Sequence, residues 1–348
     1  MNKKDEAIAV VAGGAGFVGS HLTDALLARG LRVVCIDNFQ TGRFDNLAHL
    51  EHEPRFDLID ADVIDPPPGK LTRGSIKPSY VFNLACAASP PHYQADPEHT
   101  LMTSVVGTHQ LLHLAEMTGA RFLQASTSEV YGDPEVHPQR ESYWGNVNPI
   151  GPRACYDEGK RAAEALTFDF LRARRVDARV ARIFNTYGPR MRADDGRVVS
   201  NIITQALADD DITIYGSGEQ TRSFCYVEDL VRGLIALMTH EKDYRGAVNL
   251  GNPNEISVRE LAERVVEMIG TRSSIIFRPL PVDDPRRRRP DITVAKEVLN
   301  WQPEVPLADG LARTIQHFSS VADAAAKVPL RTASRKRRTA DENRYAAS

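Results

Sequence analysis

The sequence predicts an α/β fold in which a doubly wound parallel sheet is followed by a smaller C-terminal domain. Two observations support this prediction. Short apolar runs alternate with amphipathic segments through the first half of the chain, the pattern of β-α-β units with right-handed crossovers. The first of these units has a glycine-rich turn between its strand and its helix, which is typical of a Rossmann-type sheet.

The composition is that of an ordinary globular protein. The chain has 348 residues, of which 42% are hydrophobic and 26% charged, with a net charge of −3. This balance gives no general reason to expect nucleic acid or a membrane as a partner. The four cysteines are scattered and form no Cys-x-x-Cys pair, so we expect neither a metal site nor disulfides. The N-terminus passes from charged residues directly into an apolar strand, and no apolar run approaches membrane-spanning length. We therefore expect a soluble, cytoplasmic protein.

The N-terminal half supplies the predicted sheet. Its strands are apolar runs ended by small or polar residues, and its helices have apolar residues at helical spacing. We expect strands at 7–12, 31–36, 56–59, 80–85, 121–125 and 178–184, and helices at 20–29, 100–118 and from residue 156 onward.

From residue 185 the alternation loosens. We expect helices at 198–208, 228–239, 257–269, 295–299 and 307–318, and strands at 212–215, 223–227 and 247–250. The predicted domains are 6–184 for the sheet, with segments near 223–250 returning to it, and mainly 185–318 for the smaller domain. Residues 320–348 contain a basic run and are predicted to form a disordered tail.

The glycine-rich turn predicts a dinucleotide site. Gly13, Gly16 and Gly19 stand between a strand and a helix, where small residues let a pyrophosphate approach the helix N-terminus. Asp37 ends the second strand, the position from which an acid receives the ribose hydroxyls and repels a 2′-phosphate. This favours NAD over NADP. Asp62 ends the third strand and is placed to hold the adenine amino group.

The stretch 126–160 supplies the predicted chemistry. Tyr156 and Lys160 are four residues apart, so they share one face of a helix. A phenol has a pKa near 10, and lowering it by about three units takes roughly 4 kcal/mol. A neighbouring ammonium and a positively charged nicotinamide could provide that energy. A Tyr-x-x-x-Lys spacing alone is weak evidence, and the segments around it strengthen it.

The motifs resemble those of the extended short-chain dehydrogenase/reductases that act on nucleotide sugars, and most closely their UDP-glucuronate decarboxylase branch. The resemblance covers roughly residues 7–318, although Met102 stands where the family often has a basic residue. The similar segments are STSEVYGDP (126–134), YWGNVNPIGPRACYDEGKR (143–161), RIFNTYGPRM (182–191), DGRVVSN (195–201), YGSGEQTRSF (215–224), NLGNP (249–253) and DDPRRRRPDI (283–292).

The resemblance implies NAD-dependent conversion of UDP-glucuronate to UDP-xylose and CO2 through a 4-keto intermediate, with NAD regenerated in the same site. Tyr156 would take the C4-hydroxyl proton, Lys160 would lower the phenol pKa, and Thr127 would hydrogen-bond the same oxygen. Glu129 would lie beside C5 and the carboxylate, and Arg288 would face that carboxylate. Related 4,6-dehydratases use an Asp-Glu pair here, and Ser128 replaces the Asp. We therefore expect no second acid beside Glu129.

The resemblance also implies a full set of contacts and a homodimer that pairs through helices near 100–118 and 156–174. Arg222 is expected on the pyrophosphate. The expected catalytic residues are Thr127, Ser128, Glu129, Tyr156, Lys160 and Arg288. The expected cofactor contacts are Gly13, Gly16, Phe17, Val18, Gly19, Asp37, Asn38, Thr41, Gly42, Asp62, Val63, Leu84, Thr103, Tyr156 and Lys160. The expected substrate contacts in the smaller, nucleotide-sugar-binding domain and around it are Pro90, Glu129, Asn185, Val199, Tyr215, Gln220, Arg222 and Arg288.

Two other functions fit parts of the pattern. An NAD-dependent nucleotide-sugar 4-epimerase or 4,6-dehydratase would share the glycine turn and the Tyr-Lys pair, but Glu129 disfavours the first and Ser128 the second. A catalytically silent, dinucleotide-sensing scaffold would need neither Thr127 nor Tyr156.

Overall fold

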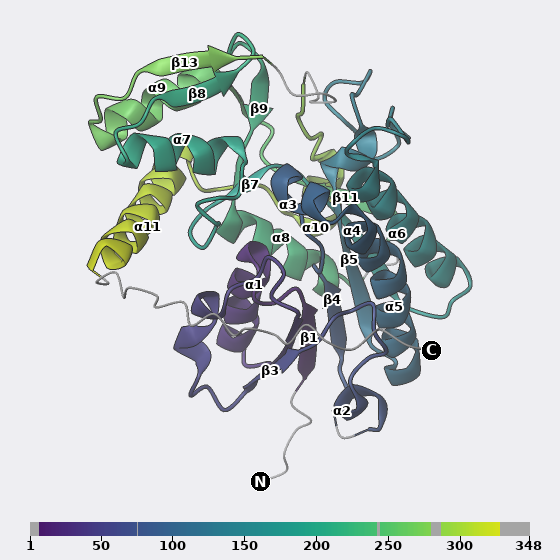
Figure 1. Ribbon diagram of the computed structural model, residues 1–348. Coiled ribbons are helices and arrows are strands. Elements are labelled where there is room, and N and C mark those ends of the chain that lie inside the picture. Colours follow the sequence, from purple (N-terminus) through teal and green to yellow (C-terminus); the bar gives the residue numbers. More distant parts are fainter. Residues whose placement is uncertain (1–6, 75, 242–243, 280–286, 328–348) are drawn as a thin grey trace, which may run out of the picture.

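A seven-stranded parallel sheet forms the centre of the molecule, as the sequence predicts (Figure 1). The computed structural model describes residues 7–74, 76–241, 244–279 and 287–327. The strand order is β11-β6-β5-β4-β1-β2-β3. The strands are β1 (Ile8–Ala12), β2 (Arg32–Asp37), β3 (Phe56–Asp60), β4 (Tyr80–Asn83), β5 (Arg121–Thr127), β6 (Ala178–Ile183) and β11 (Ala247–Leu250).

Helices cover both faces of this sheet because its strands are apolar on both sides. In β1, Ala9 and Val11 belong to one hydrophobic core, which α1 and α8 complete. Val10 and Ala12 point to the opposite face and join a second core, which α5 and α6 cover. The helices are α1 (Phe17–Ala28), α5 (Thr108–Thr118), α6 (Ala154–Arg172) and α8 (Val227–Thr239).

Some boundaries differ from those predicted. Helix α1 begins at Phe17, directly after the glycine turn, rather than at Ser20. The helix predicted at 100–118 consists of consecutive segments: α4 (Pro97–Met102), a π-helical stretch (Thr103–Gly107) and α5. The region after β4, read as a loop, contains the short helix α3 (Pro90–Ala95).

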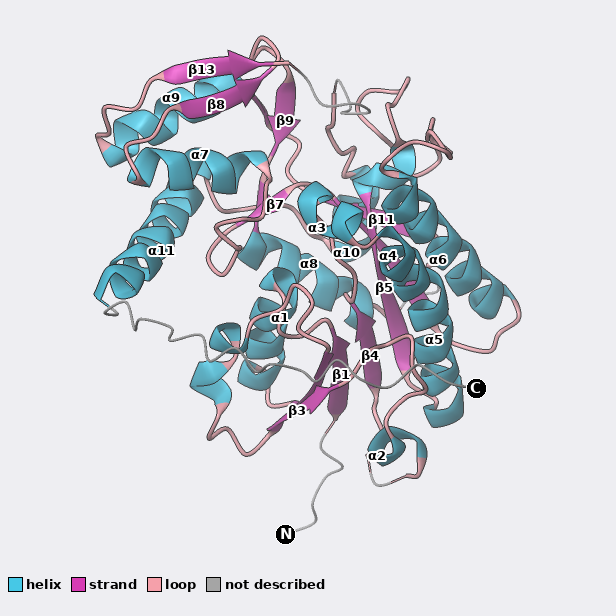
Figure 2. Cartoon of the chain, in the orientation of Figure 1, coloured by secondary structure: helices cyan, strands magenta, loops and turns pink. Residues whose placement is uncertain are grey.

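A second group of elements lies beyond the carboxyl end of the sheet (Figure 2). Two short parallel strands, β8 and β13, lie over α7 and α9 there, and α11 runs alongside. These elements are α7 (Val198–Leu207), β8 (Ile212–Tyr215), α9 (Val258–Ile269), β13 (Ile275–Arg278) and α11 (Leu307–Lys327). Smaller pieces connect them to the sheet: β7 (Thr186–Tyr187) with β10 (Cys225–Tyr226), β9 (Thr221–Ser223) with β12 (Glu255–Ser257), and α10 (Thr293–Leu299).

The C-terminal boundary needs a correction. Helix α11 continues to Lys327, so residues 320–327 are helical and do not belong to a disordered tail. The helix continues because Val321 and the alanines after it extend its favourable sequence. Residues 328–348, with the basic run, lie outside the described residues, as do residues 280–286 of the arginine-rich loop. None of the helices in the described part of the chain is long and apolar enough to span a membrane.

Candidate active site

The end of β5 presents the first predicted catalytic residues. A central strand of a parallel sheet ends at the edge where such sheets bind ligands. Thr127 is the last residue of β5 and caps the 3₁₀ turn Ser128–Tyr131, because its Oγ1 accepts a hydrogen bond from the Glu129 amide at 3.2 Å. Ser128 is buried, and the Glu129 side chain is 18% exposed. Ser128 and Glu129 thus follow the end of β5 in a turn that Thr127 caps.

Helix α6 supplies Tyr156 and Lys160 on one face. The Lys160 Nζ lies 5.9 Å from the centre of the Tyr156 ring and donates a hydrogen bond to the Ala125 carbonyl at 3.1 Å. This bond ties α6 to β5 two residues before Thr127. The ring of Tyr93, from α3, stacks on Tyr156 with centroids 5.0 Å apart. The sequence analysis did not predict this stacking of Tyr93 on Tyr156, because it predicted no helix at 90–95.

The structure corrects the expected pKa of Tyr156. Burial raises the pKa of the phenol, and a hydrogen bond with Thr127 offsets only part of that rise. We predicted a pKa lowered by Lys160. Desolvation is the largest cause of this rise in pKa, and the nearby Cys86, Glu129 and Asp157 add to it. The protein alone thus holds Tyr156 as a neutral phenol in contact with Thr127.

Arg288 reaches Glu129 across the site. Its Nη1 forms an ion pair with a Glu129 carboxylate oxygen, and its Nη2 donates to the Gly132 carbonyl at 3.2 Å. The Arg288 side chain is 4% exposed. Burial works to raise the pKa of Glu129, but Arg288 and, more weakly, Arg153 outweigh it, so the pKa is lowered. Glu129 is thus held as a carboxylate next to a buried guanidinium.

Two charged residues that the sequence analysis missed lie close to this pair. Burial, followed by the charge of Glu129, raises the pKa of Asp157 to about 7, and its buried Oδ1 has no hydrogen-bond partner among the described residues. The structure thus places a second acid near Glu129, although none was expected after the change to Ser128. Arg153 donates a hydrogen bond from Nε to the Tyr93 hydroxyl at 2.9 Å. Arg153 and Asp157 lie one helical turn apart at the start of α6, a spacing that is ordinary on a solvated helix face and so gave no signal of a buried site.

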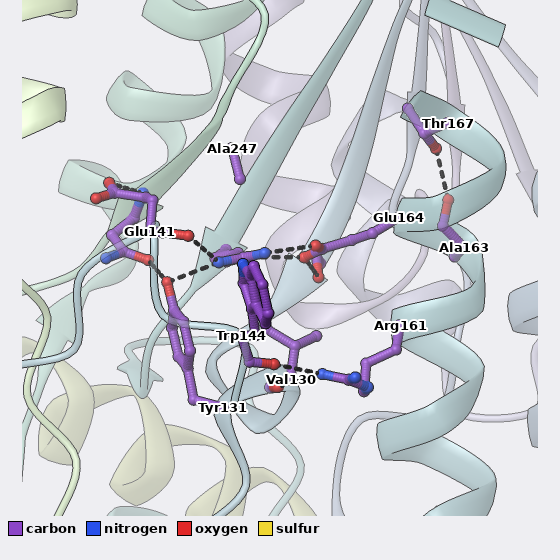
Figure 3. A network of polar contacts seen from close by, with 12 residues as sticks. Val130, Tyr131, Glu141, Trp144, Arg161, Ala163, Glu164, Thr167 and Ala247 are labelled. Atoms are coloured by element: carbon purple, nitrogen blue, oxygen red, sulfur yellow. Dashed lines mark hydrogen bonds and ion pairs between the residues drawn. The ribbon is translucent and has the colours of Figure 1, made fainter. Parts of the chain in front are cut away.

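A buried polar network supports the catalytic strand from behind (Figure 3). Glu164 of α6 accepts hydrogen bonds from Ser126 Oγ at 2.5 Å and from Arg182 Nε and Nη2 at 2.9 and 2.8 Å. Arg182 also donates to the Tyr131 hydroxyl and to the Glu141 carbonyl, each at 3.0 Å. This network joins β5, the 3₁₀ turn, α6 and β6 beside Thr127.

A pocket at the edge of β1, β2 and β4 collects most of the predicted cofactor residues. Asp62 accepts hydrogen bonds there from Asn38 and His99, both at 2.7 Å. His99 was not predicted, since nothing in its spacing marks it. The predicted residues that line the pocket are Gly13, Gly16, Asp37, Asn38, Thr41, Asp62, Val63, Leu84 and Thr103. Phe17, Val18 and Gly19, in the first turn of α1, and Gly42, in the loop after β2, are not among the lining residues.

The shape of the glycine turn fits a dinucleotide. A Cβ on Gly13, whose φ is +79°, would lie 2.8 Å from the Leu84 carbonyl carbon. A Cβ on Gly19 would lie 2.0 Å from the Gly13 oxygen. Neither position has room for a side chain, which fits a site where a dinucleotide approaches the backbone closely. Asp37 accepts hydrogen bonds from the Ala15 and Phe39 amides at 2.8 and 2.9 Å, and burial raises its pKa despite them.

The predicted substrate residues form a looser group. Arg222 is buried on β9, and its backbone pairs with that of Arg288 in an isolated bridge. Tyr215 is 44% exposed at the end of β8, and Gln220 donates to its carbonyl. Val199 is buried in α7, Pro90 begins α3, and the Asn185 carbonyl accepts from the Cys225 amide at 2.8 Å. Of this group, Glu129 contacts Arg288 through its side chain and Arg222 through its backbone.

Fold and site together define an extended short-chain dehydrogenase/reductase: a parallel sheet with a glycine-turn pocket, and a Thr, Tyr and Lys at the end of its central strand. The model of the GDP-mannose 4,6 dehydratase family matches residues 10–314. UDP-glucuronic acid decarboxylase 1 of Arabidopsis thaliana is 56% identical over 309 residues, covering 89% of this chain and 69% of the relative. The Danio rerio protein of the same name is 52% identical over 92% of this chain and 74% of its own. The chain therefore belongs to this dehydratase family and, within it, to the UDP-glucuronic acid decarboxylases.

Solved structures agree on the fold. The UDP-glucuronic acid 4-epimerase of Bacillus cereus, in complex with UDP-glucuronic acid and NAD, matches with a TM-score of 0.81 and 28% identity over 90% of this chain and 99% of its own. The dTDP-glucose 4,6-dehydratase DesIV of Streptomyces venezuelae, with NAD bound, matches with a TM-score of 0.82 and 26% identity over 91% and 98%. The two enzymes share one scaffold but differ in their reactions, so the side chains of the site decide the function.

Proposed function

We infer that the chain decarboxylates UDP-glucuronate to UDP-xylose and CO2, using NAD as a cofactor that each turnover regenerates. The observation that supports this most directly is the pair formed by Glu129 and the buried Arg288 at the end of the catalytic strand. An arginine facing a substrate carboxylate orients it, and a neighbouring acid belongs beside C5. The names and identities of the relatives point to the same reaction.

The residues divide the reaction between them. Tyr156 is the base for the C4 hydroxyl, and Thr127, in contact with it, would hydrogen-bond the same oxygen. When bound, NAD would take the C4 hydride, return it after decarboxylation, and add a positive charge that favours the phenolate. Lys160 would reinforce that charge from the same helix face. Oxidation at C4 makes a β-keto acid, which loses CO2 because the ketone accepts the electron pair as an enolate.

The surrounding residues would guide the loss of CO2 and hold the nucleotide. Arg288 would hold the carboxylate, and the stacked Tyr93 would keep water from Tyr156. We assign Arg222 to the pyrophosphate, since it adjoins Arg288 through the backbone bridge. The N-terminal sheet region would hold NAD and the region after residue 185 the nucleotide sugar.

Two further features are part of this proposal. We propose a homodimer that pairs through α5 and α6, which pack together on one side of the sheet (Figure 1). Met117, 62% exposed on α5, is an apolar contact suited to such pairing. Light scattering of the purified protein tests it. We also propose a cytoplasmic location, because all four cysteines are free thiols.

Proton NMR in deuterated buffer, with UDP-glucuronate and catalytic NAD, tests the reaction. We expect UDP-xylose with deuterium at C5 and no net NADH. UDP-galacturonate as the product would instead assign the chain a 4-epimerase activity, as in the Bacillus cereus neighbour. An unchanged spectrum would rule out the decarboxylase, and UDP-glucose and dTDP-glucose would be tried next. Arg288→Ala is the control variant, because it should keep NAD binding and lose most of the UDP-xylose.

A further inference from the structure

Arg288 owes its position to backbone contacts from other segments. It lies in no helix or strand. On one side, its backbone pairs with that of Arg222, and its carbonyl accepts a hydrogen bond from Ser223 Oγ at 3.4 Å. On the other side, the residues that follow it are held by Gln139. A side chain on such an irregular segment is only as well placed as these contacts make it.

Gln139 forms three hydrogen bonds with the segment that follows Arg288. Its amide N–H donates to the Arg289 carbonyl, and its carbonyl accepts from the Asp291 amide, both at 2.8 Å. Its side-chain Oε1 accepts from the Arg289 amide, also at 2.8 Å. The side-chain Nε2 donates to the Val136 carbonyl at 2.8 Å. Gln139 is 1% exposed, so both ends of its amide are satisfied in a site that water does not reach.

Gln139 is itself fixed to the network behind the catalytic strand. Asn249 Nδ2 donates to the carbonyls of Gln139 and Asp291, both at 3.0 Å. Asn249 Oδ1 accepts from the Tyr131 hydroxyl at 2.7 Å. Figure 3 shows Tyr131 and Glu164 on the two sides of this set of contacts, and Arg182 donates hydrogen bonds to both. The segment that carries Arg288 and the end of β5 are thus held by the same buried hydrogen-bond network.

We propose that Gln139 is a positioning residue for decarboxylation, which places the Arg288 guanidinium by fixing the backbone of Arg289. The proposal rests on the proposed function. Among the described residues, the Gln139 side chain bonds to Arg289 and Val136 and not to Thr127 or Tyr156, so its loss would displace Arg288 while leaving Thr127 and Tyr156 in place. Misplacing a reacting or orienting group by about 1 Å can cost around 100-fold in rate. Oxidation at C4 would continue, and the loss of CO2 would slow.

The test is Gln139→Met, which keeps the volume of the side chain and removes both of its hydrogen bonds. We expect kcat for UDP-xylose formation to fall about 10- to 100-fold, with the Kd for NAD unchanged and the KM for UDP-glucuronate changed far less than kcat. Absorbance at 340 nm should rise during turnover, because the oxidised sugar and NADH accumulate before the slowed step. Gln139→Asn, which keeps an amide but shortens it by one methylene, gives the same comparison if Gln139→Met does not fold.

Gln205→Met is the matched control. Gln205 Oε1 also accepts a backbone N–H, from Thr213 at 3.0 Å, in the region around α7. We expect this variant to show no rise at 340 nm. A similar fall in kcat for both variants, without NADH accumulation in either, would mean that losing such a bond acts through general stability, and would overturn the proposal.

A double-mutant cycle with Arg288→Ala decides whether Gln139 acts through Arg288. We expect Gln139→Met to change kcat of the Arg288→Ala enzyme by no more than about twofold, because the side chain it places is already gone. An equal loss in both backgrounds would show that Gln139 acts independently of Arg288. A Gln139→Met enzyme with wild-type kcat would likewise refute the positioning role. If the wild-type protein makes no UDP-xylose, the proposed function fails before this comparison is reached.

Discussion

The ion pair between Glu164 and Arg182 allows a quantitative test of how the site is supported. The two side chains are 9% and 13% exposed, and Glu164 accepts hydrogen bonds from both Arg182 and Ser126. Glu164→Ala would leave the guanidinium buried without its carboxylate, which costs about 3–5 kcal/mol. With an entropy of unfolding near 2.1 cal/mol/K per residue, the 348-residue chain loses about 4–7 °C in Tm.

Differential scanning calorimetry at neutral pH measures this shift. Asp169→Ala is the matched control, because Asp169 and Arg172 form an ion pair on the same helix with side chains 66% and 67% exposed. An exposed pair contributes about 0–1 kcal/mol, so the control should lose little more than about 1 °C. Equal shifts in the two variants would refute the reasoning, since burial would then make no difference. Replacing the buried pair with Leu at 164 and Met at 182 should recover much of the lost Tm.

Three further predictions concern the site. Asp37→Asn should weaken NAD binding about 10- to 100-fold through loss of a charged hydrogen-bond acceptor, and it should bring the Kd values for NAD and NADP closer together. Calorimetric titration with both cofactors measures these Kd values, and an unchanged Kd for NAD would contradict the prediction. Tyr156→Phe should lower kcat by about 10²- to 10⁴-fold with Tm and NAD binding near wild type; a loss below about tenfold would remove Tyr156 as the base. Asp157 has a pKa raised to about 7 by burial and by Glu129, so the stability that its protonated form contributes is complete below its unfolded pKa near 4 and is lost as the pH rises through about 7. The Tm of Asp157→Asn relative to wild type should therefore increase between pH 4 and 7 and stay level above, and a difference that decreases over that range would show the opposite shift.

The strands of the sheet could be predicted because most of them are largely buried and mainly apolar in sequence. The edge strand β3 is only partly buried, and its Leu58 is 36% exposed. No strand was predicted at Ile275–Arg278, because this apolar run is short. In the structure it forms β13, which pairs with the sequence-distant β8 and leaves Phe277 46% exposed. No helix was predicted at 90–95, where α3 begins with Pro90 and Pro91. Proline is accepted in the first turn of a helix, where its missing N–H has no partner to lose.

The candidate site shows a similar division. Tyr156 and Lys160 follow from helical spacing, and Arg288 followed from the resemblance of a whole motif. Asp157 could not be predicted, because a carboxylate in the first turn of a helix is usually solvated there. Tertiary packing buries Asp157 and places it close to the negative charge of Glu129. The raised pKa of Tyr156 likewise depends on how completely the fold encloses the ring, which a spacing pattern does not report.

The return of β11 to the sheet has a consequence for how the chain can be divided. β11 pairs with β6 from Val180 to Ile183 and completes that side of the sheet, but it comes from beyond residue 185. A fragment ending at 184 would leave β6 as an exposed edge, with a row of unpaired backbone N–H and C=O groups. Such an edge recruits strands from other copies, so this fragment should aggregate when expressed alone. The seven-stranded sheet is thus a single structural unit, but its strands do not come from one continuous stretch of the sequence.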